Sequence, residues 1–236
     1  MSVRKEINAL QQSVAREIVG QEEIVTALIT GMLADGNLLV ESLPGLAKTR
    51  AIKALSKNIE GSFSRIQFTP DLGASDIAGR QVYEEGENGK KGMHRLEPGP
   101  IFHNIVLADE VNRAPPKTQN ALLEAMEERQ VTVGGVAHKV PDLFMVMATM
   151  NPAGQEGTFP MPEAQMDRFL MHVMVDYPDE EAEANIIRLI RDEVRQENKG
   201  EDIHEATRQV ITQETIFAAR AEIDSVTVPP HVEKYI

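Results

Sequence analysis

Five short apolar runs, separated by stretches of helical or turn character, constrain the fold of this chain most strongly. The runs begin at Asn37, Phe63, Asn104, Leu143 and Phe169. Each run is as long as a strand and largely apolar, which is typical of strands buried on both faces. Helical stretches such as "TRAIKALSKNI" and "PPKTQNALLEAMEER" lie between the runs. This alternation predicts an α/β fold with a five-stranded parallel sheet between helices.

The segments around this pattern predict further elements. Apolar residues at helical spacing predict two helices before the first strand, with a break at Gly20. The segments "YEEGENGKKGMHRLE" and "ERQVTVGGVAHKV" carry glycines between strand-like arms, so we expect two inserted hairpins. After Pro178 the sequence becomes acidic and then places isoleucines and a leucine on one helical face. We therefore expect an α/β core over residues 1–177 and a helical unit over residues 178–236.

Composition narrows the classes of function. The chain has 236 residues, 42% of them apolar, a net charge of -13 and no cysteine. No run approaches the roughly 18 apolar residues of a membrane span, and the first residues lack the apolar core of a signal peptide, so we expect a cytoplasmic protein that binds no membrane. The negative charge and the lack of a Lys/Arg cluster argue against nucleic acid. The six scattered histidines and the absence of cysteine argue against zinc.

The stretch "LLVESLPGLAKTR", residues 38–50, has the layout of a phosphate-binding loop between a strand and a helix. Lys48 would reach the outer phosphates, and the Thr49 hydroxyl would hold Mg²⁺. The pattern G-x-x-x-x-G-K-[ST] has glycine where Ser42 and Ala47 stand. On this segment alone, an ordinary strand-to-helix turn capped by Thr49 remains an alternative.

Two adjacent carboxylates, Asp109 and Glu110, follow four apolar residues in "NIVLADEVNR". Open α/β sheets bind ligands at the carboxyl ends of their strands. We expect Asp109 to join the Mg²⁺ shell and Glu110 to polarise the water that attacks the γ-phosphate of a nucleotide. A loop capped by two carboxylates is the alternative. The presence of Lys48 and Thr49 upstream favours the nucleotide site.

Four segments in order, "LPGLAKT", "GPIFHNIVLADEVNRAPPKTQNALLEAMEERQVTV", "ATMNP" and "MPEAQMDRF", together resemble the MoxR branch of the AAA+ ATPases. The resemblance runs from about Ile18 to the end of the chain. The form P-G-x-A-K-T is usual in that branch, so Ala47 matches it, whereas Ser42 replaces a glycine. The resemblance implies a P-loop NTPase core of AAA+ type over residues 1–177 and a partial all-α lid over residues 178–236.

The resemblance also implies roles that spacing alone would not assign. Asn151 matches sensor 1, which places the attacking water, and Arg168 matches the arginine finger, which reaches the nucleotide of a neighbouring subunit. Arg113 is a weaker candidate for a second interfacial cation. The backbone that would contact the nucleotide is implied at Ile18, Val19 and Gly20 beside the adenine, and at Pro44, Gly45, Leu46, Ala47, Lys48 and Thr49 around the phosphates.

For function, the resemblance implies a Mg²⁺-dependent ATPase that forms a homo-oligomeric ring, expected to be a hexamer. Such a ring remodels a protein partner as a chaperone, often together with a protein that carries a von Willebrand factor A domain. A GTPase is disfavoured because "NKGE" lacks the last residue of the N-K-x-D motif. The acidic balance disfavours a DNA helicase. A nucleotide-gated scaffold with little turnover is the alternative, because Ser42 departs from the pattern and because "SVTVPPHVEKYI" ends before the sensor 2 arginine of the family's lid.

Overall fold

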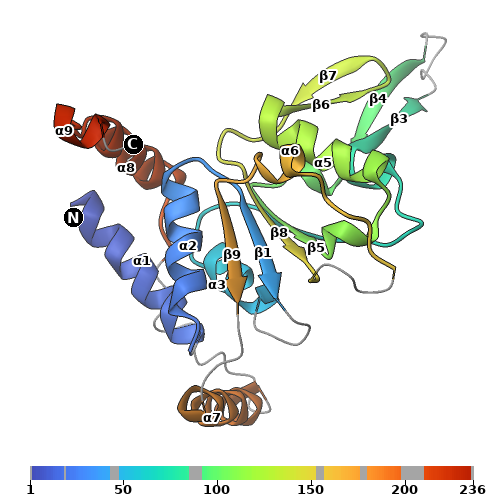
Figure 1. Ribbon diagram of the computed structural model, residues 1–236. Helices are drawn as coiled ribbons and strands as arrows, with labels where there is room; N and C mark the ends of the chain where they lie inside the picture. The colour runs from blue at the N-terminus through green and yellow to red at the C-terminus, as the bar shows by residue number, and fades with distance from the viewer. Residues whose placement is uncertain are drawn as a thin grey trace.

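A five-stranded sheet forms the centre of the molecule. The computed structural model describes residues 2–18, 20–42, 48–84, 92–152, 157–175, 180–197 and 210–234. The strand order is β2-β5-β8-β1-β9, and every pairing is parallel (Figure 1). The strands are β1 (Leu38–Ser42), β2 (Phe63–Gln67), β5 (Ile105–Asp109), β8 (Met145–Met150) and β9 (Met171–Val175). The predicted parallel sheet is therefore confirmed.

The strand order brings the predicted site residues to one edge of the sheet. Strand β8 lies between β1 and β5 and pairs with both. Asp109 ends β5, and Asn151 directly follows β8. Since the strands are parallel, their carboxyl ends meet at the same edge, where α/β sheets bind ligands.

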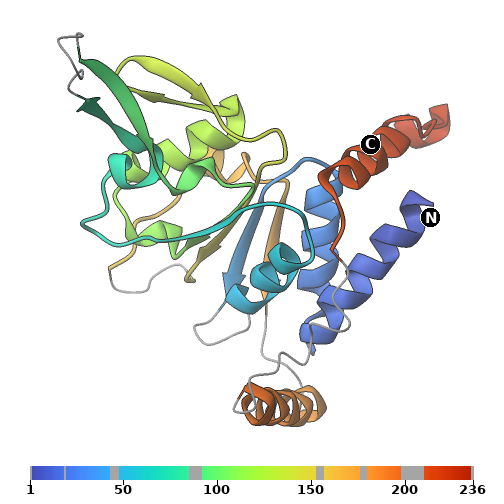
Figure 2. The ribbon, with the colours of Figure 1, turned by 180° about the vertical axis from the view of Figure 1, so that it is seen from behind.

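Helices bury both faces of the sheet, with α1, α2 and α3 on one face and α4 and α5 on the other (Figure 2). These helices are α1 (Val3–Glu17), α2 (Glu22–Leu33), α3 (Lys48–Lys57), α4 (Ala74–Ala78) and α5 (Pro116–Glu128). In β1, Leu38 and Val40 belong to the core under α1–α3, whereas Leu39 belongs to the core under α5. All three are fully buried. The side-chain alternation of a strand therefore supplies two cores, which explains why the strand sequences are apolar without a polar face.

Two hairpins extend from the same side of the core as α5 (Figures 1 and 2). They consist of β3 (Gly79–Glu84) with β4 (Met93–Pro98), and of β6 (Gln130–Val133) with β7 (Val136–Lys139). The turn of the second hairpin holds Gly134 at φ 60° and Gly135 at φ 80°. Two residues with positive φ suit the tight turn that joins twisted strands. Both predicted hairpins are present, and the connection of the first, residues 85–91, lies outside the described residues.

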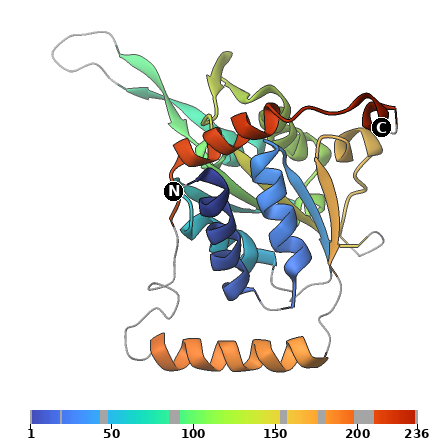
Figure 3. The same cartoon turned by 90° about the vertical axis from the view of Figure 1, so that its left-hand side faces the viewer.

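The C-terminal helices α7 (Glu180–Glu197), α8 (Gln213–Asp224) and α9 (Pro230–Glu233) do not share one environment. Helix α7 lies apart from the other helices (Figure 3), joined to α3 by an ion pair between Glu193 and Arg50. Its Ile187 is 53% exposed. In contrast, Ile216 and Ala219 of α8 are buried in the core that α1 and α2 form. The predicted domain boundary at residue 177 lies outside the described residues and stays a prediction.

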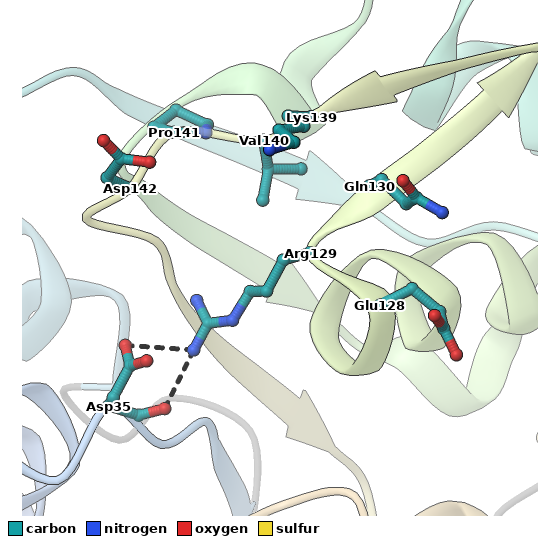
Figure 4. A pocket seen from close by; sticks show the side chains of 8 residues that line it. All are labelled: Asp35, Glu128, Arg129, Gln130, Lys139, Val140, Pro141 and Asp142. Carbon is teal, nitrogen blue, oxygen red and sulfur yellow. Dashed lines mark hydrogen bonds and ion pairs between the residues drawn. The ribbon is translucent and has the colours of Figure 1, made fainter.

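Asp35 forms ion pairs that connect α8 and the end of α5 to the turn after α2. The Arg129 guanidinium reaches across a hollow of about 330 Å³ to the Asp35 side chain, with its Nη2 3.0 Å from Oδ1 (Figure 4). Arg220 of α8 places its Nη1 2.7 Å from the same oxygen. Burial lowers the pKa of the Arg220 guanidinium, and the Asp35 charge opposes that effect. Three segments distant in sequence thus meet at one carboxylate.

None of the described helices combines the length and the apolar character that a membrane crossing requires.

Candidate nucleotide-binding site

Asp109 and Thr149 form the buried centre of the candidate site. Asp109 is the last residue of β5 and follows Ile105 and Leu107 on the face that α1–α3 cover. The Thr149 hydroxyl donates to Asp109 Oδ1 at 2.6 Å and accepts from the Glu110 backbone N–H at 2.8 Å. Thr149 is fully buried. This single hydroxyl therefore fixes both the Asp109 carboxylate and the backbone that presents Glu110.

Glu110 leaves the strand in a left-handed conformation, with φ 57° and ψ 48°. A residue with a Cβ adopts this region at a cost of about 1–2 kcal/mol, and such residues cluster at functional sites. The Glu110 Oε2 atom accepts from Arg113 Nη1 at 2.9 Å and from Gln67 Nε2 at 3.3 Å. The Glu110 carboxylate is thus held by donors on η3 (Val111–Arg113) and β2.

Arg65 of β2 completes the surroundings of Asp109. Its Nη2 and Nε atoms lie 2.5 Å and 3.2 Å from Asp109 Oδ2. The same Nη2 donates to Gln67 Oε1 at 2.8 Å. Arg65 and Gln67 are two residues apart on one strand, so their side chains leave the same face of β2. The two predicted carboxylates are therefore linked through Arg65 and Gln67.

Asn151, the predicted sensor 1 residue, is held next to this cluster. Its backbone N–H donates to Asn112 Oδ1 at 3.4 Å, and Asn112 Nδ2 donates to the Asn151 carbonyl at 3.1 Å. Both residues are buried. Because Asn112 lies in η3 directly after Glu110, this pair joins the end of β8 to the turn that carries Glu110. The structure brings together Asp109, Glu110, Arg113 and Asn151.

The phosphate-loop residues are described only in part. Lys48 is the first residue of α3, and Thr49 follows it in the same helix. The predicted contacts at Pro44, Gly45, Leu46 and Ala47, the side chains of Ser42 and Lys48, and Val19 lie outside what the structure describes. Ile18 is buried at the end of α1, and Gly20 has φ 74° in the connection to α2.

Arg168 does not join the cluster in this single chain. It follows α6 (Glu163–Met166) and forms an ion pair with Glu127 of α5. Its Nη1 also lies 3.5 Å from the Leu123 carbonyl oxygen. The predicted contact of Arg168 with the nucleotide of a neighbouring subunit stays a prediction.

A hollow of about 500 Å³ lies beside Asn151. Met161, Met166 and Phe159 supply apolar lining, and His172 Nε2 lies 3.0 Å from Glu41 Oε2 across neighbouring strands. Glu41 alternates along β1 with Val40, which faces the core under α1–α3. The hollow therefore opens on the opposite face of the sheet from α3.

The donor set at Asp109 fits a magnesium ion that arrives with phosphates. The described residues contain no group of three His, Cys, Asp or Glu side chains that could hold a metal alone. Mg²⁺ is commonly held by one or two carboxylates together with substrate phosphates and water. At Asp109 Oδ2 a cation, the Arg65 guanidinium, already sits against the carboxylate. The position therefore suits a positive charge.

The sequence patterns above did not single out four of these residues: Arg65, Gln67, Asn112 and Thr149. A signal for three of them exists. Arg65 and Gln67 are polar at period two in a strand paired with β5, so they must share a face close to Asp109. Thr149 is the polar residue within the strand sequence "MVMATM". A buried hydroxyl requires a partner, and Asp109 is that partner.

Comparisons with known proteins agree with this geometry. The model of the ATPase family associated with various cellular activities (AAA) matches residues 37–171. Chaperone MoxR1 of Mycobacterium tuberculosis is 46% identical over 185 residues, which is 77% of this chain and 48% of that protein. YeaC of Bacillus subtilis, an uncharacterized protein, is 42% identical over 95% of this chain and 67% of its own length.

A solved structure agrees as well. The structure of a Cytophaga hutchinsonii protein described as a candidate ATPase is similar to this chain, with a TM-score of 0.83 and 38% identity. The match covers 99% of this chain and 67% of that protein's chain. The chain thus spans about half to two thirds of the length of these relatives. The five-stranded sheet, the carboxylates at its edge and these matches lead to one conclusion: the chain belongs to the MoxR family of AAA+ ATPases.

Proposed function

We propose that this chain binds ATP with Mg²⁺ and hydrolyses it at the carboxyl edge of the sheet. The observation that carries the proposal is that the buried Thr149 hydroxyl joins Asp109 to the Glu110 backbone, while Asn112 joins Asn151 to the same turn. Asp109 lies on the face of the sheet that α3 covers, and α3 begins with Lys48 and Thr49. A helix N-terminus with a lysine on one side and a carboxylate on the other suits a phosphate chain with its metal.

Each residue takes one role in this proposal. Lys48 and the N–H groups of residues 44–49 bind the phosphates, while Ile18, Val19 and Gly20 lie beside the adenine. Thr49 and Asp109 hold Mg²⁺, which when bound would offset charge on the phosphates. Glu110 accepts a proton from the attacking water, and Asn151 orients that water.

A nucleotide-gated scaffold with little turnover is the second candidate. Glu110 Oε2 accepts from both Arg113 and Gln67, so an attacking water competes with these two donors at that oxygen. Ser42 adds to this candidate because it replaces the family's glycine. A single-turnover measurement distinguishes the two functions, since a scaffold would bind ATP and return it unhydrolysed.

The phosphate-loop role is tested by Lys48→Ala. We expect tight ATP binding to be lost in a calorimetric titration, because the ammonium is the main side-chain cation on the outer phosphates. Lys53→Ala is the matched control, since Lys53 is an exposed lysine five residues later in α3. Unchanged affinity in Lys48→Ala would remove the phosphate-loop assignment.

The proposal extends to a homo-oligomer, a hexameric ring in which Arg168 acts on the nucleotide of the neighbouring subunit. The ring would be a cytoplasmic chaperone that remodels a protein, with a von Willebrand factor A-domain protein as a partner. The chaperone role is supported by the name of the relative MoxR1. Arg168 is 36% exposed on its side chain and already lies at the surface of α5.

Mixing inactive subunits tests the role of Arg168. Arg168→Ala and Lys48→Ala subunits are each expected to be inactive alone, and a mixture is expected to recover ATPase activity, because a wild-type Arg168 then faces a wild-type phosphate loop. Formation of mixed rings is verified by pull-down of two differently tagged variants. Mixed rings without activity would contradict the action in trans.

A further inference from the structure

Arg65 stands where a cation would approach the Asp109 carboxylate. The Arg65 side chain is 45% exposed, whereas that of Asp109 is 11% exposed. The arginine therefore meets the carboxylate from the solvent side and can withdraw without opening the core. Its described hydrogen-bond partners, Asp109 and Gln67, are both side chains. No backbone group in the described part of the chain anchors the guanidinium.

Both oxygens of Asp109 already have partners in this arrangement. Thr149 donates to Oδ1, and Arg65 donates twice to Oδ2. Thr149 is buried and fixed by its second bond to the Glu110 backbone. A metal ion that approaches Asp109 therefore competes with Arg65 and not with Thr149. A divalent ion and a guanidinium at one carboxylate also repel each other.

Gln67 extends this contact to Glu110. Its Oε1 accepts from Arg65, and its Nε2 donates to Glu110 Oε2. The amide cannot be reversed without placing its NH₂ group against the guanidinium and its oxygen against the carboxylate. Arg65 therefore orients Gln67 so that the amide restrains Glu110. When Arg65 moves, Gln67 loses the bond that fixes its orientation.

We propose that Arg65 is an internal counter-cation that occupies the metal carboxylate in the nucleotide-free chain and gives way when Mg²⁺ arrives with nucleotide. Its displacement removes the bond that fixes the orientation of Gln67 beside Glu110. Arg65 is in this sense a positioning residue. The inference rests on the proposed function, because it requires Asp109 to be a metal ligand.

Binding of Mn²⁺ in the presence of saturating ADP, followed by electron paramagnetic resonance, tests the competition directly. We expect Arg65→Met to bind Mn²⁺ roughly tenfold more tightly than the native chain, which is the effect of one unit charge about 5 Å from a divalent ion in a water-like dielectric. Arg65→Lys keeps the charge and is expected to stay near the native affinity. Arg95→Met is the matched control, since Arg95 forms an exposed ion pair with Glu84 on the first hairpin.

The outcomes separate the inference from the proposed function. Equal or weaker Mn²⁺ affinity in Arg65→Met, with native-like ADP binding, overturns the inference and leaves the nucleotide site intact. A native chain that binds ADP with no dependence on metal overturns the metal site, and the inference with it. Thermal unfolding of each variant verifies that it is folded.

A measurement on the native chain avoids any folding defect in the variants. The side-chain Nε–H signal of Arg65, assigned by its loss in Arg65→Lys, is followed by ¹⁵N NMR. We expect it to shift when Mg²⁺ is added to the ADP-bound chain and to stay in place with ADP and a chelator. A signal that does not respond to Mg²⁺ would show that the arginine keeps its carboxylate, which overturns the proposal.

Discussion

Asp35 and Asp109 both form ion pairs with arginine, but the arginines are held in different ways. At Asp35, Arg129 also donates to the carbonyl oxygens of Asp35 and Phe144, and Arg220 donates twice to the Met32 carbonyl. At Asp109, Arg65 bonds only to side chains among the described residues. The first contact is built into the backbone of three segments. The second can be broken by the movement of one side chain.

This difference corresponds to what each contact does. The Asp35 contact lies where α2, α5 and α8 come together, so its arginines must keep their places for α8 to remain on the core. The Asp109 contact lies at the carboxyl edge of the sheet, where a ligand must enter. An arginine fixed by backbone carbonyls has lost its freedom on folding, whereas Arg65 keeps other conformations accessible. The same kind of ion pair thus holds helices together at Asp35 and forms an exchangeable contact at Asp109.

The largest expected effect separates the two regions by activity. Glu110→Gln is expected to lower ATP turnover at least about a hundredfold with little change in nucleotide affinity, because the amide keeps the shape of the side chain but cannot accept the proton. The free energy of unfolding should stay within about 0.5 kcal/mol of the native value, as for other partly exposed side chains. Steady-state ATPase assays, calorimetry and urea unfolding measure the three quantities. Equal turnover would remove Glu110 from the mechanism.

Asp35→Ala is expected to show the opposite pattern. It leaves Arg220, whose side chain is 13% exposed, without its carboxylate, so we expect a loss of about 1–2 kcal/mol in the free energy of unfolding. Nucleotide affinity should not change, since Asp35 precedes β1 and therefore lies at the amino edge of the sheet, opposite the edge that holds Asp109. Urea unfolding measures the loss, with Arg80→Ala as a control for an exposed ion pair. A native-like stability would mean that the backbone bonds of the two arginines suffice without Asp35.

The contrast between these regions also marks how far the sequence predicts the structure. The five strands and the hairpins follow from apolar periodicity and glycine placement, and each is present. Asp35 and Arg220 are 185 positions apart in the sequence, and no local sequence pattern predicts such a pair. The sequence did not predict the packing of α8 for the same reason. Ile216 and Ala219 fit the apolar face of an amphipathic helix, but their sequence does not show that they contact α1 and α2.

In the candidate site as well, some residues could be predicted from the sequence and others could not. Asp109 and Glu110 could be predicted because two carboxylates after a buried strand are chemically unusual. Asn151 and Arg168 required the family resemblance, and their roles stay predictions. Arg65 and Gln67 were overlooked because exposed polar residues in an edge strand are common, and their meaning depends on the pairing of β2 with β5. Side chains that act through other side chains are therefore the part that sequence alone predicts least.

The smallest expected effect concerns Ser42, where the family has glycine. Ser42 is the last residue of β1 and pairs with Val175 of β9, directly before the phosphate loop. A glycine there lets the backbone turn and approach phosphate more closely, so we expect Ser42→Gly to bind ATP roughly threefold more tightly. The same change should lower the free energy of unfolding by about 0.5–1 kcal/mol, because glycine weakens a strand.

The two effects of Ser42→Gly have opposite signs, which distinguishes this variant from those at Asp35. At Asp35 we expect a lower free energy of unfolding and an unchanged nucleotide affinity. At Ser42 we expect a lower free energy of unfolding together with a higher nucleotide affinity. Calorimetry with ATP and urea unfolding on one preparation measure both quantities, with Ser56→Gly near the end of α3 as a control for the cost of glycine away from the loop. Weaker ATP binding in Ser42→Gly would instead favour a serine hydroxyl that contributes a hydrogen bond to the nucleotide. The departure from the family pattern would then compensate for the missing glycine rather than weaken the site.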